Sequence, residues 1–403
     1  MSNLPQGWEV KTLSEIGEIV TGSTPSKSNL DFYGKDYPFF KPSDFEQGYF
    51  LENAGDNLSK LGFDKARQLP PKTILVVCIG SLGKVALTKV IGSCNQQINA
   101  IIPHKNIISE YIYYYCISSK FQSILFSKAP QTTLAILNKT EFSKLEIIYP
   151  KDIKEQERIV GILDFAFSKI DENIKKAKEN LANIDELMQS ALQKAFNPLN
   201  DNTKENYQLP QSWEWKSLGD TSNYGKTSQV KPSQLKGNDW ILELEDIEKE
   251  SGVLLQKVLF QDRQSKSNKI KFNKGDILFG TLRPYLKKVI IADDNGACSS
   301  EIMPFSTGNS ITNHFIYYYL FANFLHDRIS SLTYGARMPR LGTKDGKSLQ
   351  IPLPPLQEQE QIAEHLDFVF KKAKALKELY TKELQDYEEL KQSLLDKAFK
   401  GEL

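Results

Sequence analysis

The sequence contains an internal repeat, and this repeat constrains the fold more than any other feature. Residues 4–13 (LPQGWEVKTL) reappear as residues 209–218 (LPQSWEWKSL). The segments 155–167 and 186–196 likewise return, with substitutions, as 358–370 and 389–399. Two copies within one chain predict a pseudo-two-fold arrangement that needs no second subunit.

Between these shared segments the two halves diverge. The order is therefore variable block, shared segment, variable block, shared segment, which we assign to residues 1–150, 151–204, 205–355 and 356–403. A length of 403 residues already favours two or three domains. Shared segments that alternate with different variable blocks indicate a common fold in which the two blocks present different surfaces.

The shared segments are predicted to be long helices. Residues 154–196 contain no proline and a single glycine, Gly161. Their apolar residues recur at a nearly regular alternation of four and three, which is typical of a coiled-coil seam. The first seam holds Ile159, Leu163, Ala166, Ile170, Ile174, Ala177, Leu181, Ile184, Met188, Ala191 and Ala195. The second holds Ile362, Leu366, Val369, Ala373, Leu376, Tyr380, Leu384, Tyr387, Leu390, Leu394 and Ala398.

Neither seam can stay exposed to water, and the simplest partner for each helix is the other. A helix of about forty residues is about 60 Å long, so an antiparallel pair would carry a globular block at each end. The predicted fold class is α+β: two globular blocks separated by two long antiparallel coiled-coil helices, with a pseudo-two-fold internal repeat. The alternative is that each helix packs on its own block as an ordinary core helix.

The variable blocks have the pattern of α+β domains. Short runs rich in β-branched and aromatic residues lie between turn residues, which predicts strands near residues 73–78, 85–90, 98–102, 145–149, 277–279 and 288–292. Each block also carries one predicted helix, near residues 108–126 and 312–331. We interpret the tyrosines of these helices as core residues rather than as a platform for stacking bases.

Charge narrows the function. A net charge of +1 argues against a protein that binds nucleic acid non-specifically through a strongly basic surface. The two variable blocks are mildly basic and the two shared segments are acidic. This distribution favours the variable blocks for any contact with a polyanion.

The spacing of the cysteines and the hydropathy of the chain indicate its cellular compartment. No apolar run approaches the about 20 residues that span a bilayer, and the first residues lack a secretory pattern. Cys78, Cys94, Cys116 and Cys298 lie far apart, without the spacing of a metal site. We therefore expect four reduced cysteines in a cytoplasmic protein that contacts no membrane.

Motifs for catalysis are missing from the sequence. Residues 197–200 (NPLN) lack the second proline and the aromatic residue of an adenine methyltransferase motif. Residues 80–85 (GSLGKV) lack the upstream glycine and the Ser/Thr after lysine that a P-loop needs. The 4 histidines are scattered, without HExxH or a paired acid. We expect no catalytic residue, no metal site and no cofactor in this chain.

Several segments together resemble the specificity subunits of type I restriction–modification enzymes. The opening LPxxWExKxL, used twice, is similar to the start of the family's target recognition domains, and so is the run 22–26 (GSTPS). Residues 351–362 (IPLPPLQEQEQI) resemble the family's junction between recognition domain and conserved helix, and residues 148–159 are a looser version. The resemblance covers essentially the whole chain. One departure is residues 224–227 (YGKT), which replace the GSTP run in the second block.

The resemblance implies a function and partners. Each recognition domain would read one half of a split, asymmetric site in double-stranded DNA, and the helix pair would set the length of the unread spacer. Two N6-adenine methyltransferase subunits, which bind S-adenosylmethionine, would dock on the helices and domains. Restriction subunits, which translocate DNA and use ATP and Mg²⁺, would join for cleavage. This chain would be a non-catalytic subunit of that complex.

Candidate DNA contacts lie in polar loops rich in glycine and small residues. Paired hydrogen bonds to base edges give sequence readout, whereas Lys, Ser and Thr hold phosphates. The first block offers Ser23, Thr24, Ser26, Lys41, Ser81, Lys84, Lys128, Gln131, Thr132 and Thr133. The second offers Lys226, Thr227, Arg283, Tyr285, Tyr334, Arg337 and Arg340. Arg337 and Arg340 are the sharpest candidates, because their segment is too polar and broken for a core and guanidinium is the commonest partner of guanine.

Two other functions remain open at this point. One is a stand-alone restriction endonuclease with fused recognition domains, which is disfavoured because catalytic domains would need additional length. The other is a coiled-coil scaffold whose blocks bind proteins and never DNA. Binding of duplex DNA with a steep salt dependence would separate DNA readout from the scaffold.

Overall fold

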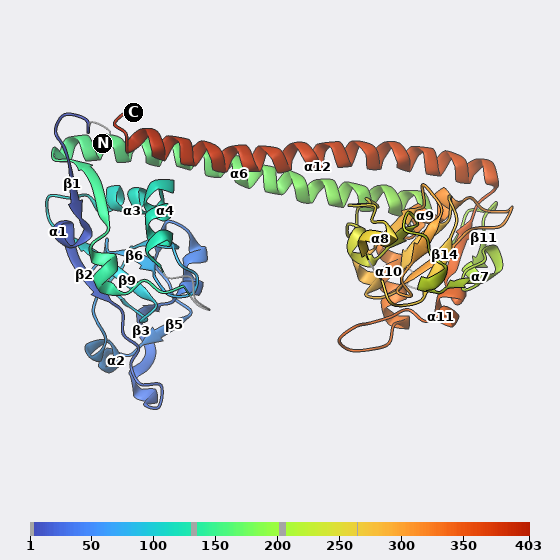
Figure 1. Cartoon of the computed structure of the whole chain (residues 1–403), viewed down its shortest axis with the longest axis horizontal. Helices are drawn as coiled ribbons and strands as arrows, with labels where there is room; N and C mark the ends of the chain where they lie inside the picture. The colour runs from blue at the N-terminus through green and yellow to red at the C-terminus, as the bar shows by residue number, and fades with distance from the viewer. Residues whose placement is uncertain (1–3, 130–134, 201–206, 264) are drawn as a thin grey trace. The chain divides into compact units, whose positions relative to one another are not determined.

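The computed structural model describes residues 4–129, 135–200, 207–263 and 265–403. The chain forms two compact units, each a mixture of strands and helices (Figure 1). Unit 1 comprises Met1–Lys176 with Glu383–Leu403, and unit 2 comprises Ala177–Lys382. Two long helices, α6 (Ile153–Phe196) and α12 (Leu356–Ala398), each contribute one end to each unit. The four-part division of the sequence stays a prediction, because this grouping of contacts does not test it.

Unit 1 is built around a strand that is buried on both faces. All residues of β6 (Ile74–Val77) are fully buried. Because successive side chains of a strand point to opposite faces, Ile74 and Val76 join the core that includes the helices, whereas Leu75 and Val77 join a second core with Phe40. Strand β6 therefore links the two apolar layers of the unit.

The strands of unit 1 form two sheets and a ribbon. The larger sheet has the order β2 (Gly17–Thr21), β9 (Ile98–Pro103), β6, β7 (Val85–Thr88), β4 (Phe50–Leu51). The smaller has the order β5 (Asp56–Leu58), β3 (Tyr33–Phe40), β8 (Ser93–Cys94). The ribbon pairs β1 (Trp8–Thr12) antiparallel with β10 (Glu146–Pro150) and so joins the opening motif to the start of α6.

The single helix expected near residues 108–126 is two helices, so that prediction was wrong. Helix α3 (Ser109–Ile117) ends where α4 (Ser119–Lys128) begins. The break is at the buried Ser118, which has an extended backbone and whose hydroxyl accepts a hydrogen bond from the Phe121 amide. Such a cap starts a new helix in place of continuing the old one. The remaining helical segments of unit 1 are α1 (Leu13–Ile16), α2 (Lys60–Lys65), α5 (Lys139–Ser143), η1 (Leu30–Phe32) and η2 (Pro42–Gln47).

Unit 2 repeats this plan with different strand partners. Its sheets have the orders β16 (Val289–Ile291), β15 (Ile277–Gly280), β18 (Ile302–Phe305) and β12 (Gln229–Val230), β14 (Lys269–Phe272), β17 (Gly296–Cys298), β13 (Trp240–Leu242). A ribbon of β11 (Glu214–Ser217) and β19 (Gln350–Leu353) is again antiparallel.

The helix expected near residues 312–331 is likewise two helices. They are α9 (Asn313–Tyr319) and α10 (Asn323–Leu332), and the extended backbone of Ala322 separates them. The other helical segments of unit 2 are α7 (Leu218–Thr221), α8 (Phe260–Arg263), α11 (Thr343–Ser348), η3 (Pro232–Gln234), η4 (Leu244–Asp246) and η5 (Pro284–Leu286).

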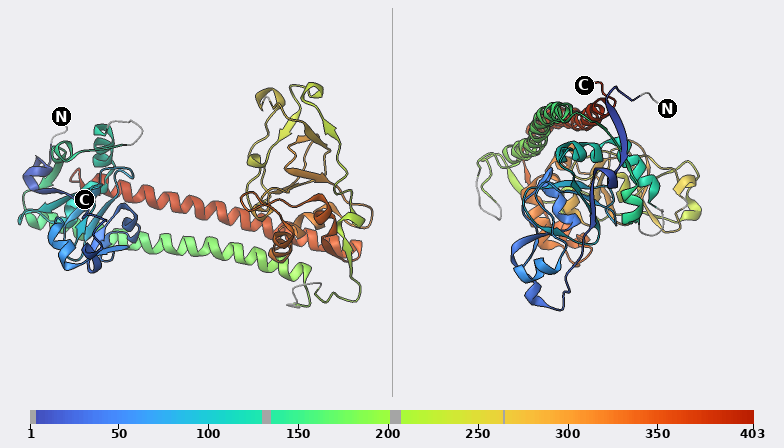
Figure 2. Two further views of the ribbon diagram at one scale, coloured as in Figure 1. Left: turned by 90° about the horizontal axis from the view of Figure 1, so that it is seen from below. Right: turned by 90° about the vertical axis from the view of Figure 1, so that its left-hand side faces the viewer.

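Helices α6 and α12 pack together in both units, side by side in two further views (Figure 2). In unit 1 the ammonium of Lys391 on α12 lies 2.5 Å from Asp171 on α6. In unit 2 Lys377 on α12 pairs with Asp185 on α6. Because the start of each helix meets the end of the other, the two run antiparallel, and the predicted fold class is confirmed.

Each helix also packs on its own block, so the two packing arrangements considered for the helices coexist. The core of unit 1 contains Leu163 from the start of α6 and Leu395 from the end of α12. The core of unit 2 contains Met188 from the end of α6 and Leu366 from the start of α12.

The second seam was wrong at two positions. Leu376 and Leu390 are 42% and 46% exposed. In unit 1 the neighbour of Leu390, Lys391, turns inward, with its ammonium 5.5 Å from the ring centroid of Phe167 and bonded to Asp171. The long aliphatic stem of a lysine can cover apolar surface while its charge stays paired, so a seam position need not be an apolar residue.

Two buried glutamines fix each block to its helix. Gln156 accepts a hydrogen bond from the Ile108 amide at 3.0 Å and donates to the Pro150 carbonyl at 2.9 Å. Gln359 accepts from the Thr312 amide at 3.0 Å and donates to the carbonyls of Ser310 and Pro354. Both side chains are fully buried. These hydrogen bonds explain why both copies of the shared motif EQE have a glutamine in the middle.

The tyrosine stripes belong to the core, as predicted. Tyr111, Tyr115 and Tyr319 are buried. Tyr114 donates to Asp164 on α6 at 2.6 Å, and Tyr318 donates to Asp367 on α12. These phenols join the globular part of each unit to the helices and are not free to stack on bases.

Candidate nucleic-acid interface

Three segments of unit 1 meet at one edge, which we call rim 1. They are the turn 79–84 between β6 and β7, the loop 95–97 between β8 and β9, and residues 135–137 before α5. The Cys78 amide donates to the Gln97 carbonyl at 2.8 Å, and the Leu137 amide donates to the Cys78 carbonyl at 2.9 Å. Ile79 and Ile136 form a further antiparallel bridge. The candidate Ser81 lies exposed in this turn.

The GSTPS loop follows the edge strand β2 and meets rim 1 at the loop 95–97. The Ser23 amide donates to the Cys94 carbonyl at 3.0 Å, and the Thr24 hydroxyl is hydrogen-bonded to the side-chain oxygen of Gln96. Ser26 lies further along the loop, where its hydroxyl pairs with Ser28 at 2.7 Å. The structure therefore brings Ser23, Thr24 and Ser81 to one rim.

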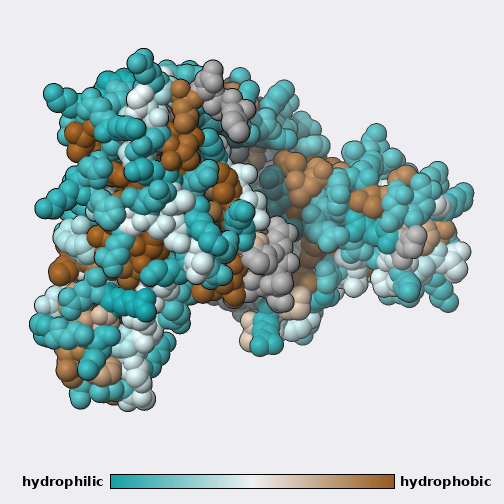
Figure 3. Space-filling view, turned by 60° about the vertical axis from the view of Figure 1, so that its left-hand side comes forward, coloured by the Kyte–Doolittle hydropathy of each residue, from teal (hydrophilic) through white to brown (hydrophobic). Residues whose placement is uncertain are grey.

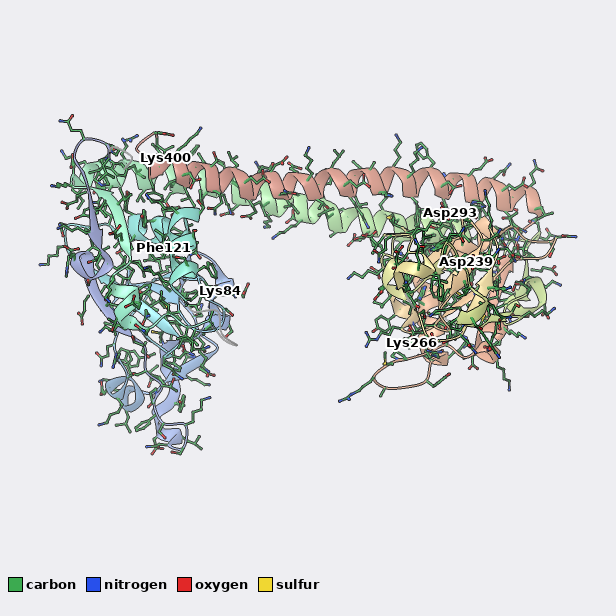
Figure 4. All side chains as sticks on the ribbon, in the orientation of Figure 1. Lys84, Phe121, Asp239, Lys266, Asp293 and Lys400 are labelled. Atoms are coloured by element: carbon green, nitrogen blue, oxygen red, sulfur yellow. The ribbon has the colours of Figure 1, made fainter. Side chains whose placement is uncertain are left out.

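The lysines of the first block are more scattered. Lys84 ends the turn of rim 1 and forms an ion pair with Glu46 that lowers the pKa of this carboxyl group (Figure 4). Lys41 pairs with Asp56 in the smaller sheet, and Lys128 is the exposed last residue of α4. Exposed ion pairs contribute little to stability and exchange partners readily, so pairing does not bar Lys84 from a phosphate. Gln131, Thr132 and Thr133 lie outside the described residues.

Unit 2 forms the equivalent edge, rim 2, from the turn 281–288, the loop 299–301 and residues 334–341. The backbone hydrogen bonds repeat those of rim 1: the Thr281 amide donates to the Glu301 carbonyl at 2.8 Å, and the Leu341 amide donates to the Thr281 carbonyl at 2.9 Å. Leu282 and Arg340 form the matching bridge. The two rims therefore share one backbone frame although their sequences differ.

Rim 2 gathers arginines and exposed tyrosines. Arg283 has a left-handed backbone (φ +49°), and its amide donates to the Pro339 carbonyl at 2.7 Å. This bond and the Tyr334–Arg340 backbone pair hold residues 334–340 against the turn. Tyr285, Tyr334 and Arg337 are exposed. The structure thus brings five of the seven candidates of the second block into one rim: Arg283, Tyr285, Tyr334, Arg337 and Arg340.

Positive charge is available at rim 2. Arg340 lies 4.0 Å from Glu301, a weak and half-exposed pair. No salt bridge to a described residue is found for Arg283 or Arg337. The guanidinium groups of Arg283 and Arg337 therefore face solvent, and that of Arg340 is held only weakly. Such groups are available to pair with guanine or with a phosphate.

Lys226 and Thr227 occupy a different place from their counterparts in the first block. Their loop lies against α11, because a Cβ added to Gly225 would meet Thr343 Cγ2 at 2.5 Å. The loop of the first block instead contacts the loop 95–97 through Thr24. The loop with YGKT in place of GSTP thus also contacts a different element of its unit.

Sequence reasoning missed the middle segment of each rim. Gln96 is exposed beside Thr24, and the Asn95 amide group bonds to the Gln97 side chain at 2.8 Å. In unit 2 the equivalent residues are Ser299, Ser300 and Glu301. The available signal was the pair of matching runs CNQQI (94–98) and CSSEI (298–302), which differ only at the loop residues.

Among the described residues, most of the groups with the largest pKa shifts have buried side chains. Burial raises the pKa of the Cys78 and Cys94 thiols to about 12, so both are inert at neutral pH. Burial lowers the pKa of His326 to about 4. Among the described residues, no group of three or more His, Cys, Asp or Glu side chains could hold a metal ion. None of the described helices is long and apolar enough to cross a bilayer.

The family model of the type I restriction modification DNA specificity domain matches residues 5–183 and again residues 210–385. The chain is 39% identical over 176 residues to the HindI specificity subunit of Haemophilus influenzae, which covers 42% of this chain and 38% of that protein. It is 29% identical over 229 residues to the MjaIX specificity subunit of Methanocaldococcus jannaschii, which covers 55% of this chain and 52% of that protein. The chain thus matches about half or less of these two relatives. An alignment with the EcoDI specificity subunit of Escherichia coli is 23% identical and covers 99% and 89%.

Two solved structures share the fold. A chain from a study of complex assembly and conformational transition of the type I R-M system superposes with a TM-score of 0.79 at 19% identity, and both chains are fully covered. The HsdS subunit of Thermoanaerobacter tengcongensis superposes with a TM-score of 0.54 at 20% identity, covering 99% and 98%. Both agree with the antiparallel helices and the two repeated units. The chain belongs to the type I restriction–modification DNA specificity family and carries the specificity domain once in each half.

Proposed function

We propose that this chain is the subunit that selects the DNA sequence in a type I restriction–modification complex, with each unit reading one half of a split, asymmetric site. One observation carries the proposal: the two rims share a backbone frame but present different side chains. A common frame serves a common ligand, double-stranded DNA. Different side chains on that frame serve two different half-sites.

The chemistry of the rims supports this division. Rim 1 offers hydroxyl and amide groups, which pair with adenine and with phosphates, whereas rim 2 offers guanidinium groups, which pair with guanine. We propose all seventeen candidate residues as DNA contacts, and we add Gln96 to them. Within the described residues, those outside the rims (Ser26, Lys41, Lys128, Lys226 and Thr227) are assigned to phosphates, which accept hydrogen bonds from hydroxyl and ammonium groups alike.

The partners follow from the same proposal. The helices would set the spacer between the half-sites and, with the blocks, bind two copies of an N6-adenine methyltransferase subunit that holds S-adenosylmethionine. Restriction subunits that use ATP and Mg²⁺ would complete the complex, which acts on DNA in the cytoplasm. We assign no catalytic step to this chain.

The test is to co-express the chain with the methyltransferase subunit of its own system and to map N6-methyladenine in the host DNA by long-read sequencing. We expect one new split motif, methylated on both strands and lost when this gene is omitted. A stable complex of the two proteins without new methylation would contradict DNA readout and favour the scaffold. A purified chain that cleaves DNA alone would favour the stand-alone nuclease.

A further inference from the structure

The turn of rim 2 contains two residues with a left-handed backbone, Arg283 and Lys287, although neither is glycine. Their φ angles are +49° and +45°. At the equivalent places of the rim 1 turn, Gly80 and Gly83 have φ angles of +83° and +89°. The end of the turn is aligned by β7 and β16, which begin two residues after Gly83 and Lys287 and pair in the same way with β6 and β15. Glycine adopts this backbone readily, whereas a side chain disfavours it, so the two side chains of rim 2 need a reason.

The proposed function supplies a reason for Arg283, which is exposed, but not for Lys287, which is only 6% exposed. Hydrophilic residues predominate on the surface of the protein, as on the face shown in Figure 3, and lysine is seldom fully buried. Burial lowers the pKa of the Lys287 ammonium. A buried ammonium is unfavourable unless hydrogen bonds compensate it, so the contacts of Lys287 inside unit 2 indicate its role.

The ammonium of Lys287 is bound by the segment between α9 and α10. It donates to the Phe321 carbonyl at 3.2 Å and to the side-chain oxygen of Asn323. That segment is itself fixed to α6 by Gln189, whose side-chain amide donates to the Phe321 carbonyl at 3.3 Å. The side-chain oxygen of Gln189 accepts from the Asn323 amide at 3.1 Å. Lys287 therefore fastens the end of the rim 2 turn to a part of the unit that is already anchored.

Unit 1 links its rim turn to the equivalent helices with a different donor. Gln122 on α4 donates to the Gly83 carbonyl at 2.9 Å and to the Cys116 carbonyl at 2.6 Å. A Cβ added to Gly83 would meet Gln122 Oε1 at 2.3 Å, so the glycine leaves room for this glutamine. The equivalent helix residue of unit 2 is His326, since it also bonds the carbonyl six residues before it. There the link to the turn comes from Lys287.

The two links of the rim 2 turn hold its opposite ends. At the first end the Arg283 amide donates to the Pro339 carbonyl at 2.7 Å. At the last end stands Lys287, and the exposed Tyr285 lies between them. Without the ammonium link, the backbone at residue 287 would favour the right-handed or extended conformations of an ordinary residue. The turn would then shift, and the side chains of Arg283 and Tyr285 with it.

We propose that Lys287 is a positioning residue for base readout by rim 2. Its buried ammonium fixes the turn on the segment between α9 and α10 and so sets where Arg283 and Tyr285 meet the DNA. Lys287 itself does not contact DNA. The inference rests on the proposed function, because it requires that rim 2 reads one half-site.

The experiment uses the full chain in complex with the methyltransferase subunit of its own system, S-adenosylmethionine and duplex DNA that contains the split motif. The kcat/KM of methylation is measured with the cognate duplex and with duplexes in which one base pair of either half-site is replaced, other than the methylated one. The ratio of the cognate to the substituted value measures discrimination. Because the fraction of active protein cancels in this ratio, a merely structural role of Lys287 would leave it unchanged.

Lys287→Met and Lys287→Gly are each expected to lower discrimination at least about fivefold at one or more base pairs of one half-site, because the contact of Arg283 with a base is lost. Discrimination in the other half-site should stay unchanged. Methionine removes only the ammonium, whereas glycine also permits the left-handed backbone. The fold should survive, because the Phe321 carbonyl keeps its bond to Gln189. Lys274→Met, exposed at the far end of β15, is the matched control and should change neither half-site.

If both variants of Lys287 discriminate as wild type does in both half-sites, the inference is overturned and the proposed function stands. If only Lys287→Gly does so, the backbone and not the ammonium sets the turn, and the inference is also wrong. An equal fall of kcat/KM with every duplex, together with a lower melting temperature, would show a structural role alone. If wild type discriminates in neither half-site, the proposed function and the inference both fall.

Discussion

At the scale of single residues, the two rims show how one backbone frame can carry two different sets of side chains. The loop of rim 1 exposes Gln96 between the buried Asn95 and the partly buried Gln97, and the same hydrogen-bonded loop of rim 2 ends in Glu301. The backbone bonds that hold these loops involve amides and carbonyls, which every residue supplies. Side chains at the rim can therefore change freely without unfolding the unit, and this is where we place base recognition.

The Arg337→Ala, Arg340→Ala double variant tests rim 2. Its methylation activity in complex should fall at least about tenfold, because one lost bidentate contact to a base is worth about 1–3 kcal/mol. The melting temperature should stay close to that of wild type, since both side chains reach solvent. Lys274→Ala, at the far end of β15 from the rim, serves as the control. Undiminished methylation would remove both arginines from the set of DNA contacts.

His326 gives unit 2 a predictable response to acid. Its ring is buried, one nitrogen lies 2.6 Å from the Leu320 carbonyl, and burial lowers its pKa to about 4. The unfolded chain has the ordinary pKa near 6.5 and so binds more protons between pH 6.5 and 4. Stability is therefore full above pH 6.5 and is lost as the pH falls through this window, by about 2 kcal/mol at pH 5. Urea unfolding at pH 7 and 5 measures this loss, and His326→Phe should show a correspondingly smaller one. An equal loss in both proteins would show that other groups are responsible.

At the scale of elements, the buried glutamines show why the helices begin where they do. Gln359 ties the first turns of α12 to the segment before α9 and to the end of β19, and Gln156 does the same for α6 with one bond fewer. Each recognition block is thereby fixed to the helix that follows it by polar contacts whose geometry is specific. Apolar packing alone would tolerate small rotations of the block.

Gln359→Leu is expected to destabilise unit 2 by about 2–4 kcal/mol, because it leaves a buried amide and two carbonyls without partners. Gln156→Leu should cost less, because it leaves one amide and one carbonyl. Chemical unfolding with a probe in each unit measures both effects. Gln361→Leu, exposed on the same helix, is the control. If both substitutions lower the free energy of unfolding equally, the number of lost hydrogen bonds does not determine the effect.

At the scale of the whole molecule, the weak net charge agrees with the proposed selection of a site and argues against non-specific coating of DNA. The candidate contacts include seven cationic side chains: Lys41, Lys84, Lys128, Lys226, Arg283, Arg337 and Arg340. The rest of the chain carries more Asp and Glu than Lys and Arg, and these seven side chains bring the total to +1. Affinity should therefore depend on these groups together.

Binding of duplex DNA by the assembled complex should weaken about a hundredfold between 50 and 200 mM salt, because the four lysines among these groups are assigned to phosphates and the three arginines to bases. Fluorescence anisotropy with a labelled duplex measures the slope of log affinity against log salt. The slope should become shallower by about one for each lysine replaced by alanine. A flat salt dependence would support the scaffold and count against DNA readout.

The sequence alone determined the repeat, the helices and the fold class, because these rest on periodic patterns that residue types express directly. The seam residues near the middle of α6, such as Ile170 and Ile174, are buried as the spacing predicted. The family resemblance followed from the same shared segments. Exceptions such as Leu390 and the break at Ser118 arose where a paired lysine or a side-chain cap competed with the apolar pattern.

Only the tertiary structure decided which candidate residues lie together. Arg283 and Arg340 are far apart in sequence, and they meet because a turn after β15 and the segment before α11 bond through their backbones. Backbone pairing leaves no mark in the sequence of a loop, so Gln96 and Glu301 were overlooked although they form the middle of each rim. Phe165 and Phe368 were visible as a repeat, but their exposure, 70% and 62%, was not. Whether a helix position faces a core or solvent depends on what packs against it, and that is settled only when the chain has folded.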